Sequence, residues 1–271
     1  EFSSAEGDGL VHAVVGAYQD QIQAFSRDRF IDVYYSRITV DDILAAFGED
    51  AGGEGRKRFL KFIDKARSRN SLQALAKLSE RRSDGDIQIV ADPPYIVPER
   101  QLEEHLDTDS IRANIEHAFK QYFDSLSPSR RQLVERYRFR DMALKVVGVG
   151  SVGTRCFIAL LTGANDDDPL FLQIKEAGRS VLEAHTSPMT VPSHGERVVI
   201  GQGLMQAVSD PFLGWSIGRQ GRHYYWRQLR DMKGSVEVEK MPFERLERYA
   251  RLCGVTLARA HARSGDSAAI S

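Results

Sequence analysis

Residues 143–175 read ALKVVGVGSVGTRCFIALLTGANDDDPLFLQIK, and this stretch decides the fold. A β-branched run leads into the glycine-rich segment Gly148–Gly153, and two further apolar runs follow at 154–161 and 170–174. A dinucleotide-binding fold needs a helix directly after its glycines, whereas a strand-like run follows them here. Taken alone, the glycines indicate only a hairpin that needs positive φ angles. The stretch predicts successive antiparallel strands.

Lys175 directly follows the apolar run 170–174 and suggests a function for the predicted strands. Strand alternation places Phe171, Gln173 and Lys175 on one face of the expected sheet. A lysine at a strand end is often only a solvated edge charge, but protein kinases use one to bind nucleotide phosphates beneath a glycine-rich loop. The residues that we expect to cradle the phosphates are Gly148, Gly150, Ser151, Gly153 and Lys175.

Beyond Lys175 the pattern predicts a helix over 198–207 and two more strands over 212–217 and 223–229. The expected fold is α+β, with a kinase-like small lobe over 137–271 that holds an antiparallel five-stranded sheet, one crossing helix and a trailing helix. Residues 9–136 read as a mainly helical region with a short β-hairpin. Residues 1–8 read as a cloning remnant or a disordered end.

Two glutamates are candidates to hold Lys175, as a helix glutamate does in kinases. Glu183 is the first choice and Glu196 the second, although either could be an ordinary surface residue. Gln228, at the end of the last predicted strand, and Asp231, just after it, lie in the segment 227–234, which would meet the nucleotide base. Otherwise this segment is a charged loop that leaves the sheet.

The catalytic parts of a kinase are missing from the chain. Phosphoryl transfer needs an aspartate base, an asparagine and a metal-binding aspartate, and the sequence contains neither H-x-D-x-x-x-x-N nor D-F-G. We therefore assign no catalytic and no metal-binding residue, and we expect this chain alone to be inactive.

Several stretches closely resemble the bacterial domain-of-unknown-function family 2252. The matching segments are 71–75, 92–94, 141–153, 167–177, 227–235 and 257–266. The resemblance implies that longer members carry G-D-x-H-x-x-N-F-G and D-F-D motifs in an earlier part, similar to the catalytic loop and metal site of aminoglycoside phosphotransferases. It implies that this chain is the nucleotide-binding half, with ATP and Mg²⁺ as cofactors of the whole parent. Two departures from the kinase pattern are Gln173, in place of a small residue, and Arg155, in place of valine.

A competing, non-enzymatic reading comes from local charge. Ten Lys and Arg residues lie between Arg56 and Arg82, against Asp64 and Glu80, and this basic helix could bind nucleic acid or another polyanion. Such a run is more often a solvated helix face. The chain as a whole has 37 Lys and Arg against 38 Asp and Glu, so its bulk charge does not favour a polyanion.

The composition also indicates the cellular compartment and the binding partners to expect. Only Cys156 and Cys253 are present, far apart in sequence, which favours a reducing, cytoplasmic environment. No run approaches the roughly 18 apolar residues of a membrane span, so we expect no membrane partner. The expected partners are a nucleotide, the earlier part of the parent protein and, through exposed apolar surface, other copies of the chain.

Overall fold

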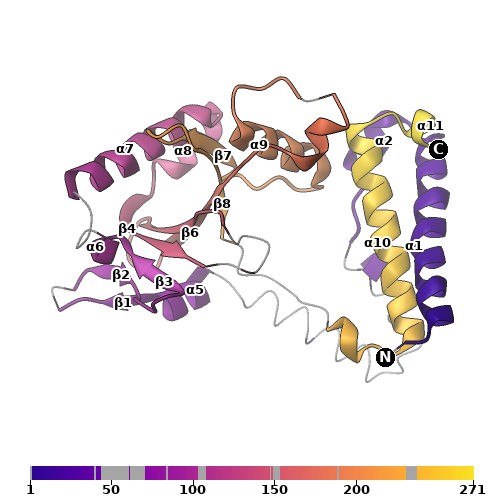
Figure 1. Cartoon of the computed structure of the whole chain (residues 1–271), viewed down its shortest axis with the longest axis horizontal. Helices are drawn as coiled ribbons and strands as arrows, with labels where there is room; N and C mark the ends of the chain where they lie inside the picture. The colour runs from indigo at the N-terminus through magenta and orange to yellow at the C-terminus, as the bar shows by residue number, and fades with distance from the viewer. Residues whose placement is uncertain are drawn as a thin grey trace. The chain divides into compact units, whose positions relative to one another are not determined.

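A computed structural model describes residues 2–39, 41–43, 61, 71–83, 85–102, 108–146, 148, 153–187, 189–229 and 237–271. The chain divides into two compact units (Figure 1). The helical unit comprises Glu1–Arg67, Gln202–Val208 and Gly234–Ser271, and the sheet unit comprises Ser68–Gly201 and Ser209–Lys233.

The sheet unit is built on six antiparallel strands in the order β3-β4-β5-β6-β8-β7. The α+β class and the antiparallel pairing are confirmed, but the expected count of five is wrong because β3 joins as a sixth, edge strand. The strands are β3 (Ile96–Pro98), β4 (Arg138–Lys145), β5 (Cys156–Thr162), β6 (Pro169–Glu176), β7 (Gly214–Ile217) and β8 (His223–Gln228).

A second, two-stranded sheet pairs β1 (Ser79–Arg81) with β2 (Ile87–Ile89). The β4 residue Asp141 ties β2 to the large sheet, since its carboxylate accepts hydrogen bonds from the Ile89 backbone at 2.7 Å and from Arg100 at 2.9 Å. Arg100 lies in the short helix α6 (Glu99–Leu102). The chain before residue 136 therefore contributes strands as well as helices to this unit.

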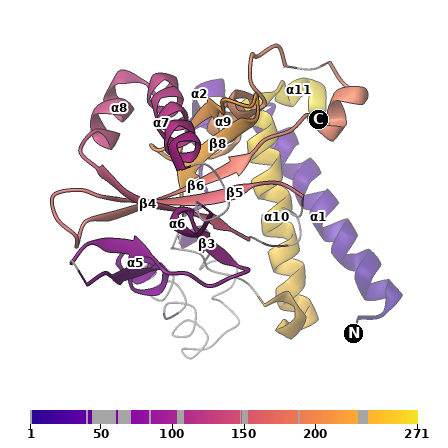
Figure 2. The same ribbon diagram turned by 60° about the vertical axis from the view of Figure 1, so that its left-hand side comes forward.

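Each face of the large sheet is covered by different elements (Figures 1 and 2). Helices α7 (Thr108–Ser125) and α8 (Pro128–Val134) lie over one face, where Tyr122 stacks on Trp226 with ring centroids 4.5 Å apart. Helix α5 (Ser71–Leu78) and strand β2 lie over the other face, packed on Ile158, Leu160 and Phe171.

This packing explains why the units do not divide at residue 136. Helix α7 presents Ile115, Ala118, Phe119 and Tyr122 on one side; Tyr122 is fully buried against the sheet, and the other three are partly buried there. Because burial of such large aromatic groups dominates core energetics, α7 and α8 belong with the strands rather than with the preceding helices.

The helical unit pairs the first long helix of the chain with the last. Helices α1 (Ser4–Phe25) and α10 (Phe243–Ser264) run parallel, with Gly9 beside Phe243 and the Tyr18 hydroxyl 2.9 Å from Nδ1 of His261. In the part of this unit that the structure describes, further helices are α2 (Phe30–Tyr35), the 3-10 turn η4 (Val238–Lys240) and α11 (Ser267–Ile270). No described helix is long and apolar enough to cross a membrane.

The first residues differ from the expected disordered end. Ser3 caps α1, because its side chain accepts from the Glu6 backbone while the Glu6 carboxylate accepts from the Ser3 backbone at 2.8 Å. This reciprocal capping satisfies backbone donors that a helix start otherwise leaves unpaired, so residues 4–8 form the first turns of the helix.

Candidate functional site

The pairing register of strands β5, β6 and β8 brings the candidate site residues together. Lys175 on β6 lies opposite Cys156 on β5 and Tyr225 on β8, while Gln173 lies opposite Arg227. Because side chains of directly paired residues point to the same side of a sheet, these five side chains share one face. We call this surface the Lys175 face.

Three positive charges meet on the Lys175 face. Burial raises the pKa of the Cys156 thiol, and the charges of Lys175, Arg227 and Lys145 partly oppose that effect, so all three lie near one point. Lys175 is half-buried and has no hydrogen-bond or ion-pair partner in the part of the chain that the structure describes. A half-buried cation without a carboxylate partner is suited to an anionic ligand.

Gln173 and Arg227 form a fixed pair on this face. The Oε1 atom of Gln173 accepts from Nε and Nη2 of Arg227 at 3.0 and 2.8 Å, and Gln173 is buried. The pair holds the Arg227 guanidinium without neutralising it, so its positive charge remains next to Lys175.

The glycine loop connects β4 and β5 at the same end of the sheet. Gly148 and Gly153 have φ angles of 35° and 82°, values that favour glycine over other residues. The other two loop candidates, Gly150 and Ser151, lie outside the described residues.

Glu183 was the first candidate to hold Lys175, but the structure pairs it with arginines instead. Glu183 lies in the 3-10 helix η3 (Val181–Ala184), where it accepts from Arg179 at 2.9 Å and from the Ser180 backbone, and pairs with Arg197 at 3.7 Å. Its charge is therefore taken up by two arginines, and no ion pair joins it to Lys175.

Glu196, the second choice, lies in the first turn of α9 (His194–Met205) and has a buried Oε2 atom without a hydrogen-bond partner. A Cβ on Gly195 would overlap the Tyr224 backbone oxygen and lie 3.2 Å from the Trp215 Cβ, so the start of α9 packs closely on the β7–β8 strands. Since Trp215 pairs with Tyr225, this helix start covers the Lys175 face.

The chain leaves β8 directly beside β6. The backbone of Gln228 donates to Oδ2 of the buried Asp210 at 2.8 Å, which fixes the end of β8. Sequence reasoning missed Asp210, which an Asp-Pro turn before an apolar run could have indicated. Asp231 lies outside the described residues, as do most of the basic residues between Arg56 and Arg69.

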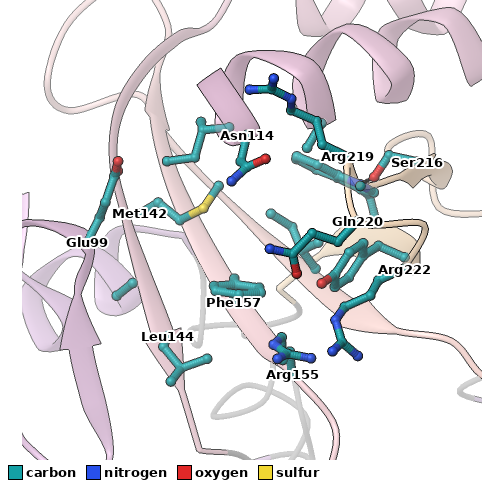
Figure 3. Close-up of a pocket in the computed structure, with 17 residues that line it drawn as sticks. Glu99, Asn114, Met142, Leu144, Arg155, Phe157, Ser216, Arg219, Gln220 and Arg222 are labelled. Carbon is teal, nitrogen blue, oxygen red and sulfur yellow. Dashed lines mark hydrogen bonds between the residues drawn. The ribbon is translucent and has the colours of Figure 1, made fainter. Parts of the chain in front are cut away.

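Arg155 lies on the opposite side of the sheet from the one the kinase pattern assigns to it. The pairing of Cys156 with Lys175 makes Cys156, not Arg155, the β5 residue on the Lys175 face. Arg155 instead lines a pocket under α7 together with Phe157 (Figure 3). With this register, Arg155 does not share the Lys175 face.

Comparison with known proteins gives one match. The family model described as "Uncharacterized protein conserved in bacteria (DUF2252)" matches residues 1–271. No curated protein and no solved structure matches the chain.

Proposed function

The chain belongs to the DUF2252 family, and for it we propose that the Lys175 face binds the phosphates of a nucleotide. In this proposal the sheet unit is the nucleotide-binding half of a kinase-like phosphotransferase. The observation that carries it is Lys175, which has no partner among the described residues and lies beside Arg227 and Lys145 at the glycine-loop end of an antiparallel sheet.

The order of elements supports the kinase-like part of the proposal. In protein kinases a glycine-rich loop joins two strands, the next strand carries the phosphate-binding lysine, and a helix that follows supplies a glutamate to hold it. Here β4, the loop, β5 and β6 precede α9, and β7 and β8 come after it. Glu196 at the start of α9 is the remaining candidate for the glutamate's role, since Glu183 is held by arginines, although no ion pair joins Glu196 to Lys175 among the described residues.

The region next to Gln173 would receive the nucleotide base. Kinases carry a small residue there, whereas Gln173 is bonded to Arg227 on this face. A base that enters must displace or stack on this pair, so the affinity for ATP is expected to be modest and to depend on the phosphates.

The described residues do not offer a metal site. Within the described ranges, no group of three or more His, Cys, Asp or Glu side chains could hold one ion. ATP and Mg²⁺ remain the cofactors proposed for a longer parent, and no metal-dependent step is assigned to the described residues.

The proposal is tested by titrating the chain with ATP. Lys175→Ala should weaken ATP binding about tenfold, the usual effect of losing one charged hydrogen bond. Adenosine, which lacks the phosphates, should bind much more weakly than ATP, and added salt should reduce ATP binding.

Lys77→Ala is the matched control, because Lys77 is an exposed lysine of the same unit that lies on α5. It should leave ATP binding unchanged. Equal affinities of the wild type and Lys175→Ala, or equal affinities for ATP and adenosine, would show that the Lys175 face does not bind phosphates.

A further inference from the structure

A cavity lies on the sheet face opposite Lys175. It has a volume of about 430 Å³ and lies between α7 and strands β4, β5, β6 and β8 (Figure 3). Small-molecule sites in proteins commonly have volumes of 300–1,000 Å³ and mostly apolar walls. The whole cavity lies within the sheet unit, so its walls come from one compact body. We call it the α7 pocket.

The walls of the α7 pocket are apolar and aromatic. Ala118 of α7 faces the sheet residues Met142, Phe157 and Ile174, and Trp226 closes the side toward the core. The Phe157 and Tyr224 rings meet edge to face with centroids 6.3 Å apart. Such a wall is suited to an alkyl chain or a ring, which would remove apolar surface from water.

Three arginines line the pocket. Figure 3 shows the guanidinium groups of Arg155 and Arg222 on one side, that of Arg219 apart from them beside α7, and Glu99 across the pocket. Arg219 and Arg222 are held by the β7–β8 turn, in which the Gly218 backbone donates to the Arg222 oxygen at 2.7 Å.

Glu176 neutralises only part of this charge. It pairs with Arg222 at 3.1 Å and with Arg155 at 3.5 Å. Burial opposes its ionisation, but the Arg155 backbone hydrogen bond and the bond from Arg222 outweigh burial and lower the pKa of Glu176. Arg155 and Arg222 therefore share one carboxylate, whereas Arg219 has no hydrogen-bond or ion-pair partner in the described ranges.

We infer that the α7 pocket binds a small amphipathic carboxylate, a medium-chain fatty acid, with the carboxylate at Arg219 and the chain along Phe157 and Ile174. Arginine forks match a carboxylate in geometry as well as in charge. This site lies on the other face of the sheet from Lys175, so it does not depend on the proposed nucleotide binding.

Calorimetric titration with octanoate tests the inference on the unmodified chain. Octanoate should bind saturably at one site, and octanol and octylammonium, which have the same chain length, should bind at least about tenfold more weakly. Absent or non-saturable octanoate binding, or equal binding of octylammonium, would overturn the proposal.

Variants locate the site. Arg219→Ala should weaken octanoate binding about tenfold, and Ala118→Leu, which fills the pocket, should weaken it as well. Arg27→Ala, which removes an exposed arginine of the helical unit, is the control and should change nothing. If Ala118→Leu folds as judged by circular dichroism and binds octanoate normally, or if Arg219→Ala binds it normally, the ligand does not enter this pocket.

Discussion

At the scale of single residues, the charge on the Lys175 face is organised by strand register. Among the described residues Lys175 has no carboxylate partner, and its strand neighbour Glu176 points to the other face, where it pairs with Arg155 and Arg222. Side chains alternate between the two faces along β6, so the sheet has a positively charged site on each face. The site at Lys175 is polar, and the site on the opposite face adjoins an apolar pocket.

The protonation of His223 is also affected by the groups around it. Its Nδ1 accepts a hydrogen bond from the His194 backbone at 2.9 Å at the start of α9. Burial and the nearby His194 disfavour the charged ring, and together they lower the pKa of His223 below its ordinary value.

This shift predicts a pH dependence of folding. Since the folded pKa lies below the unfolded value of about 6.5, the stabilisation is fully present above that pH and is lost as the pH falls through the folded pKa. His223→Asn keeps an acceptor for the His194 backbone but cannot titrate. The wild type should therefore lose stability relative to His223→Asn between about pH 7 and 5.

Urea unfolding followed by tryptophan fluorescence measures this difference, because both tryptophans, Trp215 and Trp226, lie in the sheet unit. A constant stability difference between the two proteins from pH 8 to about 5 would mean that His223 is not held neutral in the fold.

At the scale of elements, the α1–α10 pair depends on one close approach. A Cβ at Gly254 would overlap the Val14 backbone oxygen and lie 3.1 Å from the Tyr18 nitrogen. Both of these neighbours are backbone atoms of α1, so they cannot move aside as a flexible side chain would. Gly16, on the same pair, has no neighbour within 4 Å of such a Cβ.

Substitution at these two glycines should therefore have opposite effects. Alanine raises helix propensity by about 1 kcal/mol relative to glycine, so Gly16→Ala should stabilise the protein by up to that amount. Gly254→Ala should destabilise it by about 1–3 kcal/mol, because overpacking outweighs propensity. Thermal unfolding followed at 222 nm compares the two, and a Gly254→Ala protein as stable as Gly16→Ala would contradict the close helix contact.

Sequence patterns predicted some elements and not others, for identifiable reasons. The β-branched runs of β4, β5 and β6 identify strands locally, and the glycine loop and Lys175 follow from them. The partner of β3 is set by long-range pairing with β4, which no local pattern contains. A one-residue shift decides whether Arg155 or Cys156 faces Lys175, and only the observed register settles that.

At the scale of the whole molecule, the sheet unit holds both proposed sites and the helical unit pairs α1 with α10. We expect the chain by itself to show no metal-dependent ATP hydrolysis. Phosphoryl transfer depends on positioning and on charge stabilisation at the metal, and the sequence contains neither the H-x-D-x-x-x-x-N nor the D-F-G motif that supplies them. Phosphate release with MgATP that is lost in Lys175→Ala would contradict this expectation.

Protection of lysines from a chemical label tests the central claim most directly, since it uses the unmodified chain. The protein is treated with a lysine-acylating reagent with and without saturating ATP, and each lysine is quantified by mass spectrometry. ATP should protect Lys175 and Lys145, which share one face, and should leave Lys77 and Lys240 labelled as before. Unchanged labelling of Lys175 in the presence of bound ATP would contradict nucleotide binding at the Lys175 face.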